Sequence, residues 1–219
     1  MIRGLWLTPV LVLALHTAGC EGKGSTDTGF AITSVAVALR FSGPRYEGSF
    51  YQGYLPGTHF AVWVEEAEHT YLQTLGISQS VISVGDYSHL DHLPTWQKRS
   101  GTTYEAFRAE TQSGVAPSFD AVSRASVYFD ADGEDTTLTF VWDLKDRGGD
   151  PVPEGAYRSN AEVANTIKDQ ADAYEVSSEA ASVVMELAED GRATAPPTQH
   201  ILELSVWCSA TPSTKPAPP

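Results

Sequence analysis

Four side chains that can bind metal ions lie close together in the sequence, and they are Asp86, His89, Asp91 and His92. Imidazole nitrogens combined with carboxylate oxygens suit zinc or copper, and two His three positions apart share a face if the chain is helical. A stable site needs further ligands, which this local spacing does not supply. We therefore interpret the segment as a solvated acidic loop with surface His side chains, and a metal site is the alternative.

An acidic run at 130–135, Asp-Ala-Asp-Gly-Glu-Asp, offers the carboxylate oxygens that calcium prefers. The register differs from that of an EF-hand loop, because Gly133 comes too early and Val141 stands where the bidentate Glu should be. We therefore predict a turn between strands, with its carboxylates in solvent.

A third group, Asp-Ala-Val-Ser-Arg-Ala-Ser at 120–126, carries hydroxyl groups. It resembles the Asp-x-x-Ser/Thr-Gly-Ala-Thr/Ser sequence on which an extracytoplasmic flavin transferase attaches FMN through a phosphoester. The resemblance implies that Ser126 is the acceptor and that Asp120 and Ser123 help the transferase to recognise the loop. Arg124 stands where the pattern has Gly, and a Cβ is costly where the backbone needs glycine. We prefer the alternative, in which Asp120 and Ser123 cap a turn and no cofactor is attached.

Signatures of common catalytic sites are missing from the sequence. It contains no phosphate-binding glycine loop with Lys, no Gly-x-Ser-x-Gly, no His-Glu-x-x-His and no Cys-x-x-Cys. His59, His69 and His200 have no potential partner nearby in the sequence. These observations favour a protein that is not an enzyme and has neither metal nor cofactor.

The first 19 residues have the pattern of a targeting segment. Arg3 is the positive region, and residues 5–15 form an apolar stretch too short to cross a bilayer. Thr-Ala-Gly-Cys at 17–20 then resembles a bacterial lipobox, which implies that Cys20 becomes the lipidated N-terminus. The protein would be anchored at the periplasmic face of the cell envelope, and Glu21 rather than Asp after the cysteine favours the outer membrane. An ordinary secretory signal is the alternative.

The balance of charge excludes one class of partner. The chain has 14 Lys and Arg against 28 Asp and Glu, a formal net charge of −14 at pH 7. Nucleic-acid binding needs clustered Lys and Arg, so we expect no nucleic-acid partner. Anionic lipid headgroups are disfavoured for the same reason, which leaves the lipid on Cys20 as the membrane attachment. Cys208 is the second of two cysteines; it lies in an apolar alternation and is expected to face the core.

The elements that must position these residues are predicted to be strands. Apolar and polar residues alternate over short stretches that are separated by turn residues. The expected strands are 35–41, 60–64, 71–75, 104–109, 125–130, 136–142, 157–164, 181–187 and 201–208. Short helical turns are predicted at 93–98 and at 165–174. Seven to nine strands with little helix predict an all-β, antiparallel, immunoglobulin-like β-sandwich.

Composition divides the chain into four parts. We expect a lipoprotein signal peptide at 1–19, a flexible tether at 20–29, the β-sandwich domain at 30–208, and a disordered Pro-rich tail at 209–219. The length of 219 residues favours one domain over two.

The most distinctive stretch runs from Trp142 to Tyr157. Its acidic residues can accept hydrogen bonds from turn amides, and its glycines allow positive φ. We predict a hairpin-like connection between two strands, whose structural residues are Trp142, Asp143, Asp146, Gly149, Gly155 and Tyr157.

This stretch resembles the Trp-Asp-Gly-x-Asp-x-x-Gly-x-x-Val-x-x-Gly-x-Tyr hairpin of immunoglobulin-like domains related to the flagellar hook-capping protein, with Leu144 in place of the first Gly. Further blocks at 60–67, 71–75, 93–96 and 120–123 occur in the order typical of predicted periplasmic proteins of the domain of unknown function twenty-two seventy-one. The resemblance implies a sandwich fold and a periplasmic location but no reaction.

The expected function is therefore that of a binding or accessory module, whose partner is an unidentified envelope protein or a small ligand. The alternative is an electron-transfer protein that carries covalent FMN on Ser126.

Overall fold

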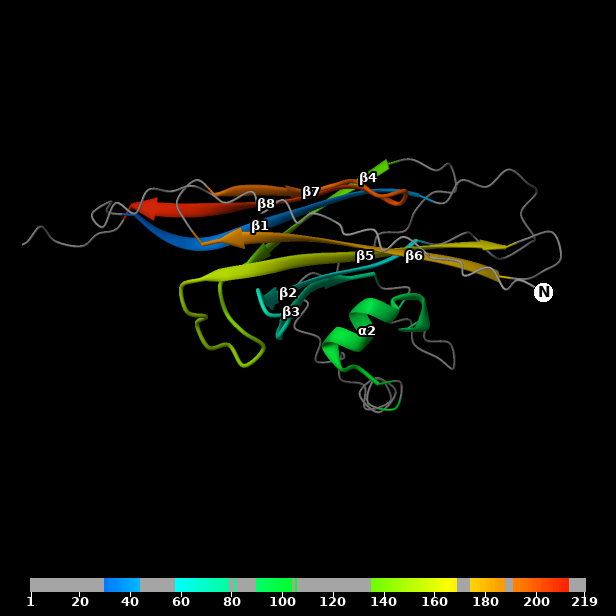
Figure 1. Ribbon diagram of the computed structural model, residues 1–219, viewed down its shortest axis with the longest axis horizontal. Coiled ribbons are helices and arrows are strands. Elements are labelled where there is room, and N and C mark those ends of the chain that lie inside the picture. The colour runs from blue at the N-terminus through cyan, green and yellow to red at the C-terminus, as the bar shows by residue number, and fades with distance from the viewer. Residues whose placement is uncertain are drawn as a thin grey trace, which may run out of the picture.

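The computed structural model describes residues 30–43, 58–78, 90–103, 135–168, 174–187 and 191–212, together with Val81 and Glu105. Within these ranges the chain is mostly β-strand. The strands form two antiparallel four-stranded sheets, which stack as two layers with one helix outside them (Figure 1). The predicted all-β sandwich of seven to nine strands is confirmed, with eight strands in the described ranges. No described helix is long and apolar enough to cross a membrane.

The first sheet has the strand order β4-β1-β8-β7, and the second has the order β3-β2-β5-β6. The strands of the first sheet are β1 (Phe30–Ser42), β4 (Asp135–Trp142), β7 (Arg192–Ala195) and β8 (Ile201–Pro212). The strands of the second sheet are β2 (Thr58–Glu66), β3 (Tyr71–Ile77), β5 (Ala156–Lys168) and β6 (Tyr174–Glu186). A 3-10 turn, η1 (Leu90–His92), and the helix α2 (Pro94–Ser100) follow β3.

The main core lies between the two sheets. Val35, Val37 and Leu39 of β1 alternate with outward-facing residues and are fully buried. They pack in one cluster with residues of the second sheet, including Phe60 and Val62 of β2. The period of two in the sequence therefore marks the face of each sheet that packs on the other sheet, as in an antiparallel sandwich.

The segment 142–157 joins the two sheets, so the predicted hairpin between its flanking strands is wrong. β4 belongs to the first sheet and β5 to the second. A smaller hairpin occurs within the segment, where Lys145 and Pro151 form a bridge and the Asp146 amide donates to the Asp150 carbonyl at 2.9 Å. The turn residues encode this local reversal, but they do not encode which sheet the next strand joins.

The two aromatic residues at the ends of this segment are core residues. The Trp142 side chain is fully buried, and its Nε1–H donates to the Lys145 carbonyl at 2.7 Å. The Tyr157 ring packs edge-on against it, with ring centroids 5.1 Å apart. The Tyr157 hydroxyl donates to the Pro153 carbonyl four residues upstream, the arrangement of a tyrosine corner in immunoglobulin-like sandwiches. Burial, and then the negative charge of Glu66, raise the pKa of Tyr157 above 10.0.

The two aspartates predicted to be structural behave differently. The Asp146 carboxylate accepts from the amides of Gly148 at 2.8 Å and Asp150 at 3.0 Å, as expected for a turn aspartate. Asp143 instead forms a surface ion pair with Lys145 at 3.1 Å. The predicted role of Asp146 is therefore confirmed, whereas that of Asp143 as an acceptor for turn amides is wrong.

Positive φ occurs at two positions of this segment where backbone freedom matters. Gly149 has φ +85°, as its place in the turn requires. Leu144 has φ +61°, at the position where the hook-capping pattern has Gly. A Leu in this conformation is strained, and its side chain packs against the main core. Leu144 therefore meets the backbone requirement of this turn with strain.

Strands β5 and β6 are longer than the sequence indicates. They pair along their whole length, from Ala156 with Glu186 to Lys168 with Tyr174. The helical turn expected at 165–174 is therefore wrong at 165–168 and at 174, where the backbone pairs across the two strands. Residues 169–173 lie outside the described residues.

Other boundaries also differ from expectation. β7 was not predicted; its four residues pair with β8 at the edge of the first sheet. β8 continues to Pro212, which pairs with Phe30, so the sheet extends beyond the expected domain end at 208. Glu105 is helical, which contradicts the strand expected at 104–109. The rest of that range and the strand expected at 125–130 lie outside the described residues.

Candidate functional site

The residues predicted to do chemistry lie largely outside the described residues. These are Cys20, Asp86, His89, Asp120, Ser123 and Ser126. Asp91 and His92 are described and belong to η1. Within the described ranges no group of three potential metal ligands occurs. Of the acidic run, Asp135 is described, and it forms an ion pair with Arg40 at 2.9 Å.

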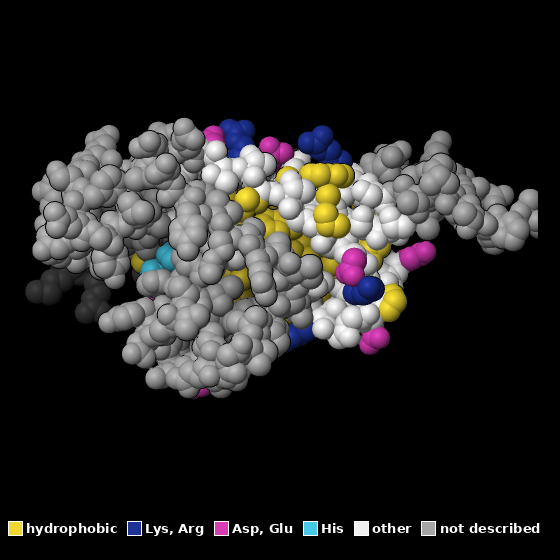
Figure 2. All heavy atoms as spheres, turned by 180° about the vertical axis from the view of Figure 1, so that it is seen from behind, with side chains coloured by type: hydrophobic (Ala, Val, Ile, Leu, Met, Phe, Trp, Pro, Cys, Tyr) yellow, Lys and Arg dark blue, Asp and Glu magenta, His cyan; other side chains and the backbone are white. Residues whose placement is uncertain are grey.

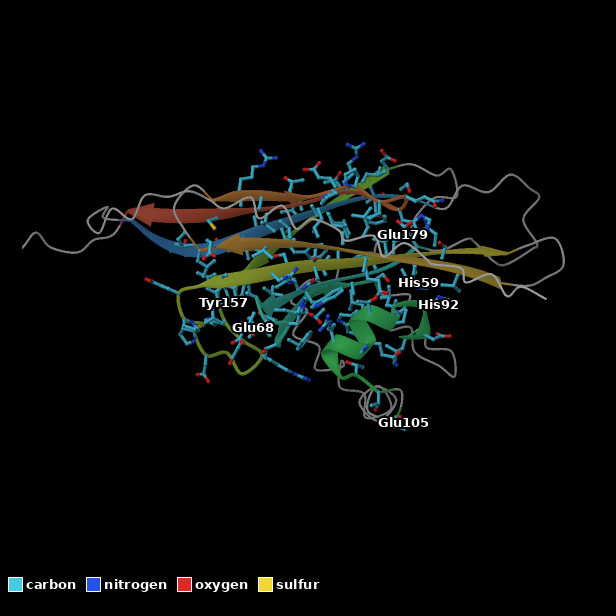
Figure 3. All side chains as sticks on the ribbon, in the orientation of Figure 1. His59, Glu68, His92, Glu105, Tyr157 and Glu179 are labelled. Carbon is cyan, nitrogen blue, oxygen red and sulfur yellow. The ribbon has the colours of Figure 1, made fainter. Side chains whose placement is uncertain are left out.

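His92 contacts a histidine that the sequence had left without a partner. The rings of His59 and His92 meet edge to face with centroids 4.8 Å apart (Figure 3). His59 is buried at the start of β2, and η1 carries His92 to it. The tertiary structure thus pairs His92 with a residue distant in sequence.

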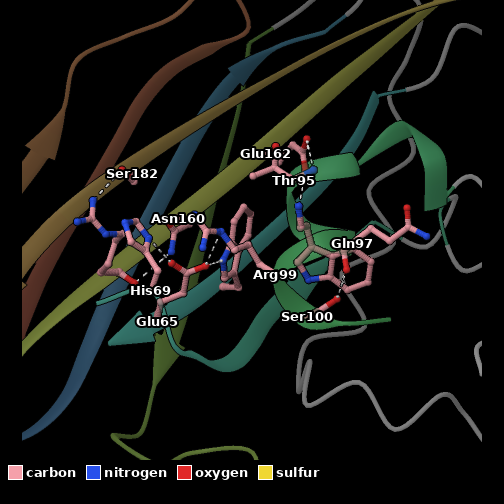
Figure 4. Close-up of polar contacts among 12 residues, drawn as sticks. Glu65, His69, Thr95, Gln97, Arg99, Ser100, Asn160, Glu162 and Ser182 are labelled. Carbon is pink, nitrogen blue, oxygen red and sulfur yellow. Dashed lines mark hydrogen bonds and ion pairs between the residues drawn. The ribbon is translucent and has the colours of Figure 1, made fainter. Parts of the chain in front are cut away.

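A buried glutamate on the outer face of the second sheet lies at the centre of a group of polar side chains. Glu65 is 1% exposed and lies near the end of β2. Its Oε1 accepts from the Trp63 Nε1–H at 2.8 Å, and its Oε2 lies 3.1 Å from His69 Nδ1. Arg99 of α2 completes the set, with its Nε 3.6 Å from Oε1. We call Trp63, Glu65, His69 and Arg99 the Glu65 cluster (Figure 4).

The turn between β2 and β3 presents His69 to Glu65. The Glu66 amide donates to the Thr70 carbonyl, and the His69 amide donates to the Glu66 carbonyl. His69 has φ +72°, a conformation that usually needs Gly or Asn. Strained residues of this kind concentrate at functional sites, where the surrounding structure holds them in place.

The position of Arg99 depends on a second buried carboxylate. Glu162 of β5 is 1% exposed and accepts from the amides of Thr95 at 3.1 Å and Trp96 at 2.7 Å. A negative charge at the N-terminus of α2 compensates amides that have no partner within the helix. Ser178 of β6 donates to the same carboxylate at 2.7 Å. Glu162 therefore attaches α2, and with it Arg99, to the sheet.

Trp96 holds the other side of α2 against the sheet. Its side chain is fully buried, and its Nε1–H donates to Thr74 Oγ1 at 2.9 Å. It packs in a second apolar cluster, which also contains Leu90, Leu93 and Trp63. The helical turn predicted at 93–98 is confirmed. Trp63 belongs both to this apolar cluster and to the Glu65 cluster, so the two are continuous.

The arrangement leaves polar groups of the Glu65 cluster at the surface. The side chains of His69 and Arg99 are 45% and 39% exposed, whereas that of Glu65 is 1% exposed. An ionised carboxylate can only accept, so the His69 Nδ1 carries the proton and Nε2 is turned away from Glu65. The site therefore combines a fixed imidazole with a guanidinium, two groups suited to binding polar ligands.

A second cluster lies where β5, β6 and β8 come together. His200 is buried; its Nε2 lies 2.9 Å from Ser177 Oγ and its Nδ1 lies 3.3 Å from Asn165 Nδ2. The set resembles a Ser-His-Asn triad, but the Asn165 amide group is oriented by two other contacts. Its Nδ2 donates to the Ser42 carbonyl at 3.3 Å and its Oδ1 accepts from Thr58 at 2.7 Å.

That amide orientation argues against catalysis by His200. Because Asn165 presents a donor, His200 Nδ1 must accept, and Nε2 then carries the proton and donates to Ser177. An imidazole in this tautomer cannot remove the Ser177 proton, which a triad base must do. We therefore interpret the His200 cluster as a polar connection between the two sheets.

Glu179 is attached to the same cluster. Its Oε2 accepts from the His200 amide at 2.8 Å. Burial alone raises the pKa of Glu179. Hydrogen bonds from the Thr198 side chain and the His200 amide, together with smaller contributions, lower it by a larger amount in total, so the net pKa lies below 4.5. The ionised form of Glu179 therefore stabilises the end of the sandwich.

The outer face of the first sheet carries a row of cross-strand neighbours. Val141, Ala36, Trp207 and Arg192 stand opposite one another on β4, β1, β8 and β7. Val141 is 65% exposed, and a hollow of about 430 Å³ is lined by Gly191, Arg192, Trp207 and Cys208. Cys208 packs against the main core, as expected, but is only half-buried.

In the view of Figure 2, described side chains of both charges are interspersed with hydrophobic ones, without a patch of a single sign.

The Glu65 cluster was not identified by sequence reasoning. The expectation that His69 has no partner nearby in the sequence is wrong, because Glu65 four positions earlier contacts it. Arg99 lies 34 positions beyond Glu65 in the chain. One signal was present, because Trp63 and Glu65 share a strand face and His69 follows at the turn. None of the family models, curated proteins or solved structures compared with this chain matches it. Membership of the domain-of-unknown-function family therefore stays a prediction.

Proposed function

We propose that the protein is a lipid-anchored module at the periplasmic face of the cell envelope, with the outer membrane favoured, and that it binds a ligand or an envelope protein without transforming it. Support for the anchor comes from the apolar segment at 5–15 and the lipobox-like residues 17–20. A rigid antiparallel sandwich is a common scaffold for binding, although the fold alone does not specify a function.

The observation that carries the binding proposal is the Glu65 cluster. Glu65 is buried and holds the exposed His69 in place, and it is itself contacted by Trp63 and Arg99. Binding sites need donors and acceptors that are already in place, because ordering them on binding reduces affinity. Among the described residues, no hydroxyl or thiol group contacts His69, so the arrangement favours recognition over nucleophilic chemistry.

A thermal-shift screen of small molecules tests this proposal. A compound that binds only the native state stabilises it by RT ln(1 + c/Kd), where c is its free concentration, so Tm rises with the logarithm of that concentration once it exceeds Kd. We expect stabilising compounds to lose their effect on the His69→Ala variant and to keep it on Glu154→Ala, an exposed residue outside the cluster. Equal stabilisation of both variants would place the site elsewhere. Chemical conversion of a bound compound, followed by mass spectrometry, would instead identify an enzyme.

Covalent attachment of FMN to Ser126 is a second candidate function. The observation that favours it is the spacing of Asp120, Ser123 and Ser126 in a chain with a secretion signal. The protein would then hold a flavin outside the cytoplasm for electron transfer. Intact mass after co-expression with a flavin transferase tests this candidate. An FMN-sized adduct that is absent from Ser126→Ala supports it, and an unmodified wild type rejects it.

A further inference from the structure

Arg158 is a half-buried strand arginine that forms no ion pair with any acidic residue in the described part of the chain. It lies on β5 directly opposite Glu65 of β2, so both side chains emerge on the same face of the sheet. Its Nη1 donates to Ser182 Oγ at 3.2 Å, while its Nε is buried and has no acceptor among the described residues. None of the ion pairs within the described ranges includes Arg158. A buried donor without an acceptor requires an explanation.

The surroundings of Arg158 contain further donors. His69 lies on the Ser182 side of Glu65, and Arg99 lies on its opposite side (Figure 4). Besides its Nε contact with Glu65, Arg99 contacts no acceptor through its terminal nitrogens in the described part of the chain. The Glu65 cluster and Arg158 thus combine one carboxylate with two guanidinium groups, and protonation of His69 would add another positive charge.

This positive excess is unusual in a chain with a formal net charge of −14. Glu66 and Glu68 flank the turn that carries His69, yet neither pairs with Arg158 or Arg99 among the described contacts. Within the described contacts, Glu65 is thus the acidic partner of His69 and Arg99, and Arg158 is not paired with a carboxylate. A guanidinium fork that lacks an acceptor is suited to a carboxylate or a phosphate group.

We propose that Arg158, His69 and Ser182 bind the oxyanion group of a small ligand, either a carboxylate or a phosphate, and that Arg99 adds positive charge from the opposite side of Glu65. This inference rests on the binding function proposed above for the Glu65 cluster. The Arg158 Nε–H and a terminal N–H form two parallel hydrogen bonds to the oxyanion. His69 Nε2 accepts from a ligand hydroxyl when its ring is neutral and donates to an oxyanion oxygen when its ring is charged.

NMR titration of the full-length protein tests the inference through a reporter within the site. The Trp63 Nε1–H donates to Glu65, and Glu65 also holds His69, so the indole resonance responds to a ligand beside them. The probes are inorganic phosphate and acetate, with sodium chloride at equal ionic strength, glucose and calcium chloride for comparison. Stronger binding of phosphate would indicate a phosphate group as the natural oxyanion, and stronger binding of acetate would indicate a carboxylate.

We expect a saturable shift with phosphate or acetate but not with chloride. Arg158→Gln should weaken this binding by about tenfold or more, because it removes a charge-assisted pair of hydrogen bonds. Arg158→Lys, which keeps the charge but lacks the fork, should also weaken it. Arg192→Gln is the matched control; it removes the same charge from an exposed strand arginine on the other sheet and should leave binding unchanged.

Three results would overturn the inference. A saturable shift with glucose or calcium chloride alone would leave the binding site standing but reject its oxyanion chemistry. No shift with any probe would reject both the oxyanion and the binding function of the cluster. Equal weakening by Arg158→Gln and Arg192→Gln would show a general charge effect and not a site.

Discussion

The Glu65 cluster contains a buried carboxylate next to a residue with a strained backbone. Glu65 is almost completely buried, and His69 adopts a left-handed backbone conformation beside it. A buried carboxylate is tolerated only where donors surround it, and here an indole, an imidazole and a guanidinium supply them. Glu65, whose burial would be unfavourable without these donors, is thus the residue that organises the exposed polar groups.

We predict that Glu65→Ala lowers the free energy of unfolding by about 1–3 kcal/mol, because it leaves the buried Trp63 Nε1–H without its acceptor. Glu65→Gln should cost less, since the amide oxygen can still accept from Trp63. Urea denaturation followed by Trp fluorescence measures both changes. Glu68→Ala, at an exposed turn position, is the control and should stay within about 0.5 kcal/mol of the wild type. A loss for Glu65→Ala no larger than that would show that the cluster is peripheral to stability.

A second prediction concerns Glu179 and pH. The folded-state pKa of Glu179 lies below the ordinary value of 4.5, so its carboxylate stabilises the fold above that pH. This contribution should be lost as the pH falls from about 4.5 through the lowered pKa. Glu179→Gln should therefore be less stable than the wild type near neutral pH, and the difference should shrink in acid. Thermal unfolding of both proteins across this range tests the sign. A gap that widens in acid would contradict it.

At the scale of elements, Gly76 marks a close contact between the two sheets. A Cβ built on Gly76 of β3 would lie 2.1 Å from the Phe140 ring of β4, in the opposite sheet. Phe140 is 4% exposed and belongs to the main core, so its ring has little room to move. The absence of a side chain at Gly76 therefore allows the sheets to pack with Phe140 between them.

Gly76→Ala should destabilise the protein by about 1–3 kcal/mol through overpacking against Phe140. Phe140→Leu alone should also destabilise it, but the double variant should be more stable than the sum of the two losses predicts, because the smaller side chain makes room for the new methyl group. A double-mutant cycle from urea melts gives this coupling energy. Strictly additive losses would show that the two residues do not contact each other.

At the scale of the whole molecule, the sandwich is one unit that the N-terminal segment would attach to a membrane. β1 begins at Phe30, ten residues beyond Cys20. A lipid on Cys20 would therefore hold the sandwich close to the membrane. With so short a connection, the lipid, and not the acidic protein surface, would determine the location.

We predict that Cys20→Ser moves the protein from the membrane fraction to the soluble periplasmic fraction, because the lipid proposed for this residue would be attached to its thiol. Cell fractionation with immunodetection measures the change. Cys208→Ser is the matched control, since Cys208 lies on β8, and should not change the distribution. An unchanged distribution of Cys20→Ser would support an ordinary secretory signal instead.

The sequence by itself determined the class of fold and the positions of most strands. Strands such as β1 and β2 could be predicted because burial of one sheet face imposes a period of two on neighbouring residues. The short helix with Trp96 was predictable as well, since Pro94 at its first position and an apolar docking residue are local signals. The sequence did not predict the full length of β5 and β6, because these strands extend through a polar stretch without alternating apolar residues.

Only the tertiary structure decided which sheet each strand joins and which side chains meet. The segment 142–157 forms a local turn at its acidic residues and glycines, as its residue types predict, but the strands at its two ends belong to different sheets. His200 lies 35 positions from Asn165 and 23 from Ser177, and Arg99 lies 34 from Glu65. Local patterns report the environment of a residue along its own strand. They carry no information about contacts that arise when separate strands and a helix pack together, such as the contact of Arg99 with Glu65.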